Sequence, residues 1–379
     1  MKSLLRMFFV FTLLLVLLIF PLHAAGTIKI GAIFPITGPI ATFGISSANG
    51  VKMAFEEVNA KGGVLGSKIE LILEDDQYKA EEVANAAKKL IERDKVVAII
   101  GEVASSMSLV LAPICQASKV VMMTPTSTNP KVTLVGDYIF RACFIDDFQG
   151  TVMANFVYKT LKKKTSAMLV AVTSDYSKGL AQFYKESYVK LGGKIVAEES
   201  YSEGDPDFRA QLTKIKAANP EFVYLPGYYS DIGPILLQAR ELGITVPFGG
   251  GDGWDSPKLL ETAGKAAEGC FFSNHYSPES KDIKVQTFVK NYKKKFEETP
   301  DALAALSYDA ALLLVEAIKK ANSSEPSKIK EALMSFTKDK PFRGVTGSIF
   351  FDQNRNPVKS AVIIEIKGGK QVYRATVKP

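Results

Sequence analysis

Two adjacent serines, Ser105 and Ser106, follow the apolar segment 96–100 and begin a stretch with the composition of a helix. A serine at such a junction can cap the helix by accepting a hydrogen bond from one of its first N–H groups. Alternatively, its hydroxyl and those N–H groups can hold an anion, which the helix dipole also favours. We expect Ser106 to cap the helix and Ser105 to hold the carboxylate of a ligand.

Hydroxyl residues also follow the next apolar segment, 120–123, in a loop that contains Thr126, Ser127 and Thr128. Each hydroxyl can both donate and accept a hydrogen bond. Taken alone, such a loop is more typical of a turn or a helix cap than of a binding site. If the two apolar segments are neighbouring strands, however, this loop and Ser105 together form a cradle for a small carboxylate.

The second half of the chain places aromatic and acidic residues at similar positions. Tyr176 and Tyr228 each follow an apolar segment, and Asp252 and Trp254 lie in the glycine-rich stretch 249–254. Glycine lets the backbone approach a ligand closely. An aspartate there could pair with an ammonium group, with an aromatic wall beside it. A turn aspartate and rings packed in the core are the alternatives that the residues leave open.

Residues typical of catalysis are scarce. After residue 25 the sequence has one histidine, His275, so neither a histidine metal cluster nor an HExxH motif can form. No GxSxG elbow, P-loop or GxGxxG after a strand occurs either. The adjacent acids Asp75 and Asp76 are more typical of a solvated loop than of a metal or glycosidase site. We therefore expect no enzyme, no metal and no cofactor, and an ordinary loop or core role for His275.

The balance of charge is weakly basic, with a formal net charge of +7. Lysines and arginines are scattered along the chain, so we expect a solvated surface and no nucleic-acid partner. The three cysteines, Cys115, Cys143 and Cys270, are widely spaced and odd in number. This pattern favours buried free thiols over disulfides.

The first 25 residues have the order of segments typical of a secretory signal peptide. Lys2 and Arg6 precede an apolar run at 7–20, and small residues follow up to Ala25. The run is shorter than the roughly 20 residues that a membrane span needs. We expect the signal peptide to be removed and the mature protein to be exported, soluble and periplasmic.

Apolar strands alternate with amphipathic helices along the rest of the chain; Val51, Ala54, Phe55 and Val58, for example, share one helical face. The predicted strands are 27–34, 69–73, 96–100, 120–123, 167–172, 195–197, 222–225, 246–248, 269–272, 348–351 and 361–366. The predicted helices are 46–60, 79–93, 105–117, 177–191, 206–218, 231–242, 303–321 and 327–337. This alternation predicts an α/β fold with mostly parallel sheets covered on both faces by helices.

The alternation restarts near residue 145, which predicts two lobes. We expect residues 26–145 to form the first part of lobe I and 146–274 the first part of lobe II. The segment 275–352 then returns to lobe I, and 353–379 returns to lobe II. Because ligands in open α/β sheets bind beyond the carboxyl ends of the strands, the ligand is expected in the cleft between the lobes.

Several motifs stand in a specific order over nearly the whole mature chain. They are "PITGPIATFG" (35–44), "VNAKGGVLG" (58–66), "EDDQ" (74–77), "GEVASS" (101–106), "MTPTSTNP" (123–130), "DYSKGLA" (175–181), the segment 224–243, "GGGDGW" (249–254) and "SYDA" (307–310). In this order the sequence resembles the type I periplasmic binding proteins, specifically the leucine/isoleucine/valine-binding proteins of ABC transporters. The resemblance implies two Rossmann-like lobes, joined by three crossovers, that close over a ligand.

The resemblance also implies a set of ligand-binding residues. In that family the positions of Ser105 and Thr126 to Thr128 hold the α-carboxylate and α-ammonium groups of an amino acid, and an acid at the position of Asp252 completes the ammonium site. The family places aromatic rings at the positions of Phe43, Tyr176, Tyr228 and Tyr308. Trp254 joins the set because it is close to Asp252. The predicted ligand-binding residues are Ser105, Thr126, Ser127, Thr128, Tyr176, Tyr228, Asp252, Phe43, Trp254 and Tyr308.

Some positions depart from the family pattern. Phe43 stands where well-known members have tyrosine, and Asp252 stands where they have glutamate. Thr126 and Ser127 replace smaller residues, and the disulfide that some relatives form is absent because Tyr78 and Ala104 occupy its positions. These changes are compatible with amino-acid binding but loosen the inference of a strictly branched aliphatic ligand.

The function implied by the resemblance is that of an extracytoplasmic substrate-binding protein. Such a protein captures an amino acid, here a branched-chain one, and delivers it as a monomer to a membrane ABC permease. Two alternatives stay open. The same fold could bind an amide, a urea or an aromatic acid, or the protein could be a sensor subunit that reports its ligand to a signalling partner.

Overall fold

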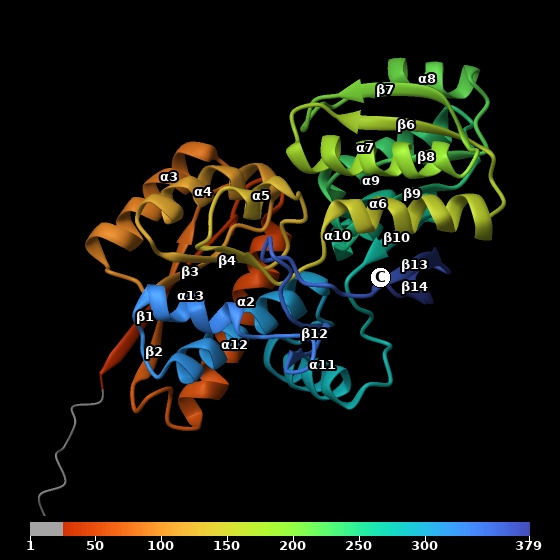
Figure 1. Cartoon of the computed structure of the whole chain (residues 1–379). Coiled ribbons are helices and arrows are strands. Elements are labelled where there is room, and N and C mark those ends of the chain that lie inside the picture. The colour runs from red at the N-terminus through yellow and green to blue at the C-terminus, as the bar shows by residue number, and fades with distance from the viewer. Residues whose placement is uncertain (1–25) are drawn as a thin grey trace, which may run out of the picture.

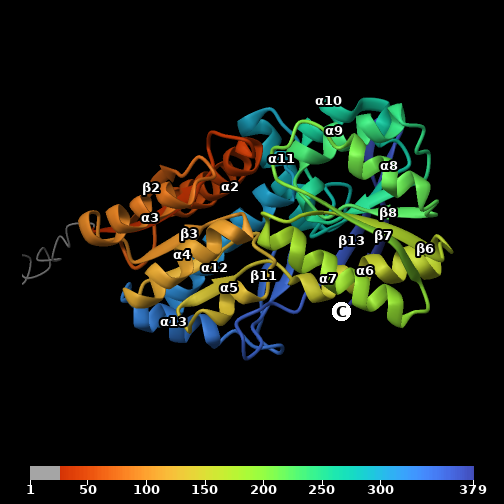
Figure 2. The same ribbon diagram turned by 90° about the horizontal axis from the view of Figure 1, so that it is seen from above.

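The computed structural model describes residues 26–379 and folds them into two α/β lobes that lie side by side (Figures 1 and 2). The predicted signal peptide, residues 1–25, lies outside the described residues. Within the described residues, no helix has both the length and the apolar composition needed to cross a membrane.

The first lobe is built on a five-stranded sheet in which all strands are parallel, in the order β2-β1-β3-β4-β5. Its inner strands are largely apolar, and every residue of β3 and β4 is buried. Burial on both faces is the expected state of such strands in a parallel sheet. The strands are β1 (Thr27–Phe34), β2 (Lys68–Asp75), β3 (Ala98–Gly101), β4 (Val121–Thr124) and β5 (Ile139–Arg141).

Helices cover both faces of this sheet (Figure 1). The helices α2, α12 and α13 pack against one another on one face, and α3 and α4 lie on the other. Their bounds are α2 (Ala41–Ala60), α3 (Ala80–Lys88), α4 (Ser105–Ala117), α12 (Ala302–Ala321) and α13 (Pro326–Met334). Shorter or peripheral elements of this lobe are η2 (Lys89–Arg93), α5 (Lys131–Leu134), α11 (Ile283–Phe296) and the hairpin of β11 (Phe342–Gly344) and β12 (Gly347–Ile349).

The second lobe repeats this plan with seven strands in the order β14-β13-β10-β9-β8-β6-β7. The five strands from β10 to β7 are parallel, while β13 and β14 pair in antiparallel fashion at one edge. The strands are β6 (Thr165–Ala171), β7 (Lys194–Tyr201), β8 (Phe222–Tyr224), β9 (Phe248–Gly250), β10 (Phe271–Asn274), β13 (Ala361–Lys367) and β14 (Lys370–Val377).

The helices of the second lobe also form two layers, with α6 and α7 on one face and α8, α9 and α10 on the other (Figures 1 and 2). They are α6 (Asp146–Asn155), α7 (Asp175–Lys190), α8 (Arg209–Ala217), α9 (Tyr229–Glu241) and α10 (Pro257–Ala263), with the short turns η3 (Phe156–Thr160), η4 (Asp252–Trp254) and η5 (Gly264–Ala267).

The chain passes between the lobes three times, after β5, after β10 and before β13. The three passages touch one another. The ring of Phe144 in the first stacks on His275 in the second, with ring centroids 3.8 Å apart. In the third, buried Lys359 donates a hydrogen bond to the carbonyl of Ala142 over 3.0 Å. The predicted fold of two lobes joined by three crossovers is therefore confirmed.

Several helices and strands were not predicted from the sequence: β5, α5, α6, α10, α11, β11 and β14. Helix α11 contains many lysines, which make its apolar face less obvious in the sequence. Its buried residues, Val285, Phe288, Val289 and Tyr292, nevertheless have the spacing of one helical face, so this signal was present in the sequence. The strand β14 lacks such a pattern, because it is largely exposed.

Candidate functional site

Both sheets have a point at which the strand order reverses, between β1 and β3 in the first lobe and between β6 and β8 in the second. Parallel strands on either side of such a point leave a crevice at their carboxyl ends, where ligands bind. The loops after these strands face each other between the lobes. They carry most of the residues of a narrow cavity.

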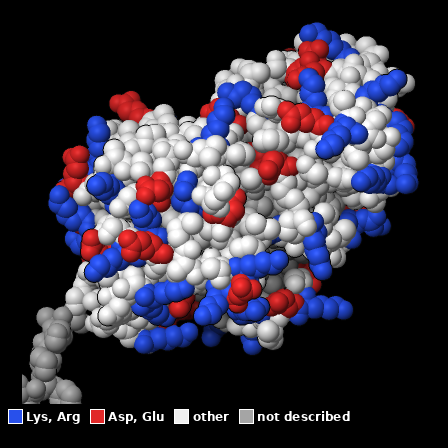
Figure 3. Space-filling model, viewed as in Figure 1, with Lys and Arg blue, Asp and Glu red and all other residues white. Residues whose placement is uncertain are grey.

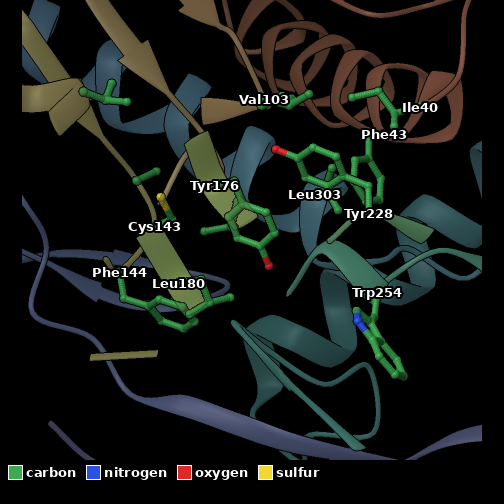
Figure 4. Close-up of a cluster of buried hydrophobic side chains, with 14 of the residues drawn as sticks. Ile40, Phe43, Val103, Cys143, Phe144, Tyr176, Leu180, Tyr228, Trp254 and Leu303 are labelled. Atoms are coloured by element: carbon green, nitrogen blue, oxygen red, sulfur yellow. The ribbon is translucent and has the colours of Figure 1, made fainter. Parts of the chain in front are cut away.

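The cavity lies between the lobes and is closed in this conformation. The cavity has a volume of about 20 Å³, which is close to the room that one water molecule needs. Figure 4 shows several of its side chains converging from different elements. The lining residues are Phe43, Val103, Ser105, Thr126, Tyr176, Tyr228, Asp252, Gly253 and Leu303.

The polar wall of the first lobe is formed at the start of α4. Ser105 is the first residue of this helix, and the preceding residue, Ala104, offers no side-chain cap. The first N–H groups of a helix lack partners within it, so this end can bind an anion. The hydroxyl of Ser105 accepts a hydrogen bond from the N–H of Asn129 over 3.2 Å and retains its own proton for donation. Beside it, Thr126 donates its hydroxyl to the carbonyl of Val103 over 2.9 Å.

The polar wall of the second lobe is the carboxylate of Asp252. Its Oδ1 accepts hydrogen bonds from Gln149 Nε2 over 2.9 Å and from the hydroxyl of Tyr176 over 2.8 Å. Its Oδ2 contacts His275 Nε2 over 3.0 Å. Within residues 26–379, no lysine or arginine forms an ion pair with this carboxylate. Asp252 is thus held by three side chains while its charge lacks a cationic partner.

Glycine makes this arrangement possible at position 251. A Cβ atom there would lie 2.3 Å from Gln149 Nε2 and 2.5 Å from the hydroxyl of Tyr176. Any larger residue would therefore push away two of the donors that hold Asp252.

Aromatic rings from both lobes form the remaining wall. Tyr176 and Tyr228 stack with centroids 5.1 Å apart, and Phe43 meets the Tyr228 ring edge-on at 5.8 Å. Together with Val103 and Leu303 they give the cavity an apolar side. Burial raises the pKa of both tyrosine hydroxyls well above the usual value, so both rings are neutral.

Six of the ten predicted residues line the cavity: Phe43, Ser105, Thr126, Tyr176, Tyr228 and Asp252. Ser127 does not, because its hydroxyl bonds to Ser108 Oγ and to the carbonyl of Glu102, over 2.6 and 3.0 Å. Thr128 also lies behind the wall, where its carbonyl accepts a hydrogen bond from the N–H of Asp146 over 3.0 Å. Both residues therefore lie outside the lining of this cavity and support the loop.

Trp254 and Tyr308 are also absent from the lining. Trp254 is fully buried behind the glycine-rich loop and donates to the carbonyl of Leu225 over 3.0 Å; Figure 4 shows it apart from the other rings. Tyr308 lies five residues after Leu303 on α12, which turns it about 140° around the helix axis. Its hydroxyl donates to Glu57 over 2.7 Å in a separate groove.

The predicted cap at Ser106 is also corrected. The helix α4 begins at Ser105, and the hydroxyl of Ser106 accepts a hydrogen bond from the N–H of Asp175 over 2.9 Å. Asp175 begins α7 in the other lobe. Ser106 therefore caps a helix, but across the cleft.

Sequence reasoning missed five residues of this region. Val103, Gly253 and Leu303 line the cavity, and Gln149 and His275 hold Asp252. Gly253 directly follows Asp252 and Val103 lies two residues before Ser105, so proximity could have indicated them. Gln149, His275 and Leu303 lie on other elements, and no local pattern marks them. His275 is buried in the core, as predicted, but its contact with Asp252 was not anticipated.

Further hydrogen bonds connect the lobes at the edge of the cavity. Asn129 Nδ2 donates to the carbonyl of Asp175 over 2.8 Å, and the hydroxyl of Tyr78 donates to Glu203 over 3.1 Å. The hydroxyl of Tyr229 accepts from the N–H of Thr42 over 3.3 Å. These contacts hold the cleft closed.

Two buried carboxyl groups lie behind the first-lobe wall. Asp76 and Glu102 lie close together, and burial raises the pKa of Asp76 to about 6 and that of Glu102 well above its usual value. The charge of Asp76 further raises the pKa of Glu102, so the pair holds a proton near neutral pH.

The described residues include no group of three or more histidine, cysteine or acidic side chains placed to hold a metal ion. Cys115, Cys143 and Cys270 are buried free thiols, as predicted. On the face shown in Figure 3, basic and acidic side chains are interspersed.

The chain is similar to known proteins over nearly its whole length. Residues 27–371 match the family model described as periplasmic binding protein. The leucine-, isoleucine-, valine-, threonine- and alanine-binding protein of Pseudomonas aeruginosa is 33% identical over 94% of this chain and 93% of its own length.

Two solved structures are similar in sequence and in fold. The leucine-binding protein LivK of Thermotoga maritima is 42% identical, with a TM-score of 0.89 over 93% of this chain and 99% of that one. The branched-chain amino acid transporter substrate-binding protein LivJ of Streptococcus pneumoniae, solved with isoleucine, is 34% identical, with a TM-score of 0.88 over 93% of this chain and 100% of that one. The chain therefore belongs to the periplasmic binding protein family.

Proposed function

We propose that this protein is the extracytoplasmic substrate-binding protein of an ABC transporter and that it captures an amino acid, preferably a branched-chain one. The observation that carries this proposal is the state of Asp252. A buried carboxylate held only by neutral donors is costly without a cation. The ammonium group of an amino acid would supply that cation.

The opposite wall complements the other end of such a ligand. The hydroxyl of Ser105 and the first N–H groups of α4 would hold the α-carboxylate, and the helix dipole adds to that attraction. The side chain would then contact Phe43, Val103, Leu303 and the two stacked tyrosines. Apolar walls of this kind favour an aliphatic side chain over a polar one.

The lobes must separate for a ligand to enter, because residues of both lobes line the cavity. We propose boundaries near residues 145, 274 and 352, with the segments on either side moving as two units. A ligand that touches both walls would favour the closed form, as in hinge closure generally. The closed form would then be the one delivered to a membrane permease by a monomeric, periplasmic protein.

The relatives are named as proteins that bind leucine, isoleucine or valine, and this supports the proposal. An amide, a urea or an aromatic acid would leave the charge of Asp252 without a partner. A sensor role would use the same site with a different protein partner.

The test is a calorimetric and thermal-shift comparison of defined ligands with the purified protein. We expect leucine, isoleucine and valine to bind and to raise the melting temperature, and 4-methylpentanoate, which is leucine without its ammonium group, to bind far more weakly. Equal binding of leucine and 4-methylpentanoate, or binding of benzoate or acetamide alone, would contradict the proposal.

A further inference from the structure

We propose that His275 sets the charge of the ligand that the site accepts. As a neutral hydrogen-bond donor it orients Asp252 without neutralising it, so a ligand must bring its own cation. This role makes His275 a positioning residue, and it rests on the proposed function of the site.

The environment of the imidazole fixes its orientation. The side chain is 1% exposed, and its ring stacks on Phe144 at 3.8 Å with an angle of 28° between the planes. Because the partner of Nε2 is a carboxylate oxygen 3.0 Å away, Nε2 carries a proton. Nδ1 is buried and has no hydrogen-bond partner within residues 26–379. An added proton on Nδ1 would be a buried donor without an acceptor, so the ring is favoured in its neutral form.

The charges that surround His275 come from three segments. Burial is the main cause that lowers the pKa of His275, and Lys359 from the third crossover lowers it too. Asp252 and Asp255, both in the loop after β9, act in the opposite direction. Asp146 at the start of α6 lies near Asp252, and burial raises the pKa of its own carboxyl group well above the usual value. The net result is a pKa below the usual value for histidine.

Protonation of His275 would change the selectivity of the site. An imidazolium would form an ion pair with Asp252 and would repel the ammonium group of a ligand. Amino-acid affinity should therefore fall as the pH decreases through the pKa of His275. The affinity for a carboxylate without an ammonium group should rise over the same range. By linkage, binding of an amino acid must lower the pKa of His275, and binding of a carboxylate without an ammonium group must raise it.

The position of His275 also connects the site to the hinge. It follows β10 directly, its ring packs on the first crossover, and Lys359 of the third crossover lies near it. The orientation of Asp252 is thus set by the segments on which the lobes turn.

The experiment measures Kd by calorimetry between pH 7.5 and 4.5 for leucine and for 4-methylpentanoate, with the wild type and with His275→Gln. Glutamine keeps a neutral donor to Asp252 but does not titrate. For the wild type we expect the leucine affinity to fall toward a limit of about tenfold per pH unit below the pKa of His275. The 4-methylpentanoate affinity should rise. In His275→Gln both pH dependences should be lost, whatever the leucine affinity of the variant at pH 7.5.

A direct readout does not depend on the variant. His275 is the sole histidine of residues 26–379, so its NMR signals identify themselves. Titration of the wild type should give a lower pKa with leucine bound and a higher pKa with 4-methylpentanoate bound. If the two ligands leave the pKa of His275 unchanged, or if His275→Gln keeps the pH dependence of the wild type, the inference is overturned while the proposed function stands. If the wild type binds no amino acid at any pH, the proposed function itself fails.

Discussion

The hydroxyl of Ser106 in the first lobe accepts a hydrogen bond from the backbone N–H of Asp175 in the second lobe, over 2.9 Å. Asp175 is the first residue of α7, whose N-terminal N–H groups need partners from outside the helix. The closed cleft supplies one of them. This bond therefore links the state of the hinge to the end of a helix that borders the cavity.

Replacement of Ser106 by alanine should favour the open cleft. We expect the Ser106→Ala variant to bind leucine about 2- to 10-fold more weakly, which corresponds to the loss of one ordinary hydrogen bond. Calorimetry and small-angle X-ray scattering measure the affinity and the degree of closure. Ser118→Ala, at the exposed far end of the same helix, is the matched control. Wild-type affinity in Ser106→Ala would show that the contact does not contribute to closure.

Replacement of Ser105 by alanine tests the carboxylate wall. Loss of a hydrogen bond to a charged group should weaken leucine binding by roughly 1.5–3 kcal/mol. Ser108→Ala is a suitable comparison, because Ser108 lies one turn further along α4 and bonds only within the first lobe. We expect that variant to lower the free energy of unfolding by about 1 kcal/mol and to leave the affinity unchanged. The reverse pattern would place the ligand carboxylate elsewhere.

Replacement of Asp252 by asparagine removes the charge but keeps the size of the side chain. Leucine affinity should fall by on the order of 3 kcal/mol, because the ammonium group loses its buried partner. The affinity for 4-methylpentanoate should stay the same or increase. Circular dichroism and thermal melting check that the variant is folded. An Asp252→Asn variant that binds leucine normally would mean that another group holds the ammonium.

The Asp76–Glu102 pair predicts a pH dependence of stability. A carboxyl group whose pKa is higher in the folded state stabilises the fold at low pH, and this contribution is lost as the pH rises through the folded-state pKa. For Asp76 that value is about 6, against an ordinary value of 3.8. The pair therefore destabilises the protein above about pH 6 relative to pH 4.

Glu102→Gln should remove this effect, since its amide can donate to Asp76 while its oxygen still accepts from the N–H of Ala104. We expect the variant to be more stable than the wild type at pH 8, on the order of 1 kcal/mol, and to show a flatter pH dependence between pH 4 and 7. Urea unfolding at several pH values measures both. A variant that is less stable at pH 8 would mean that the pair favours the fold through its packing.

Part of the site could be predicted because its residues directly follow strands. Ser105, Tyr176, Tyr228 and Asp252 each lie just beyond the carboxyl end of a strand, and the alternation of strands and helices identifies those ends. In parallel sheets all such ends meet at one edge. Local pattern was therefore enough to bring these residues to the cleft.

The direction of each side chain within a loop was decided only by the tertiary structure. Thr126 and Ser127 are adjacent, yet one lines the cavity and the other bonds to Ser108 and Glu102. Asp252 and Trp254 are two residues apart and point to opposite sides of their loop. Loops lack the fixed periodicity that relates spacing to direction in helices and strands.

The sequence by itself determined two α/β lobes, a cleft between their strand ends and an acid opposite a helix N-terminus, because these follow from local order along the chain. The tertiary structure alone decided what holds that acid. Gln149 and His275 reach Asp252 from 103 and 23 residues away. Contacts at such separations depend on how the elements pack, and no spacing in the chain encodes them.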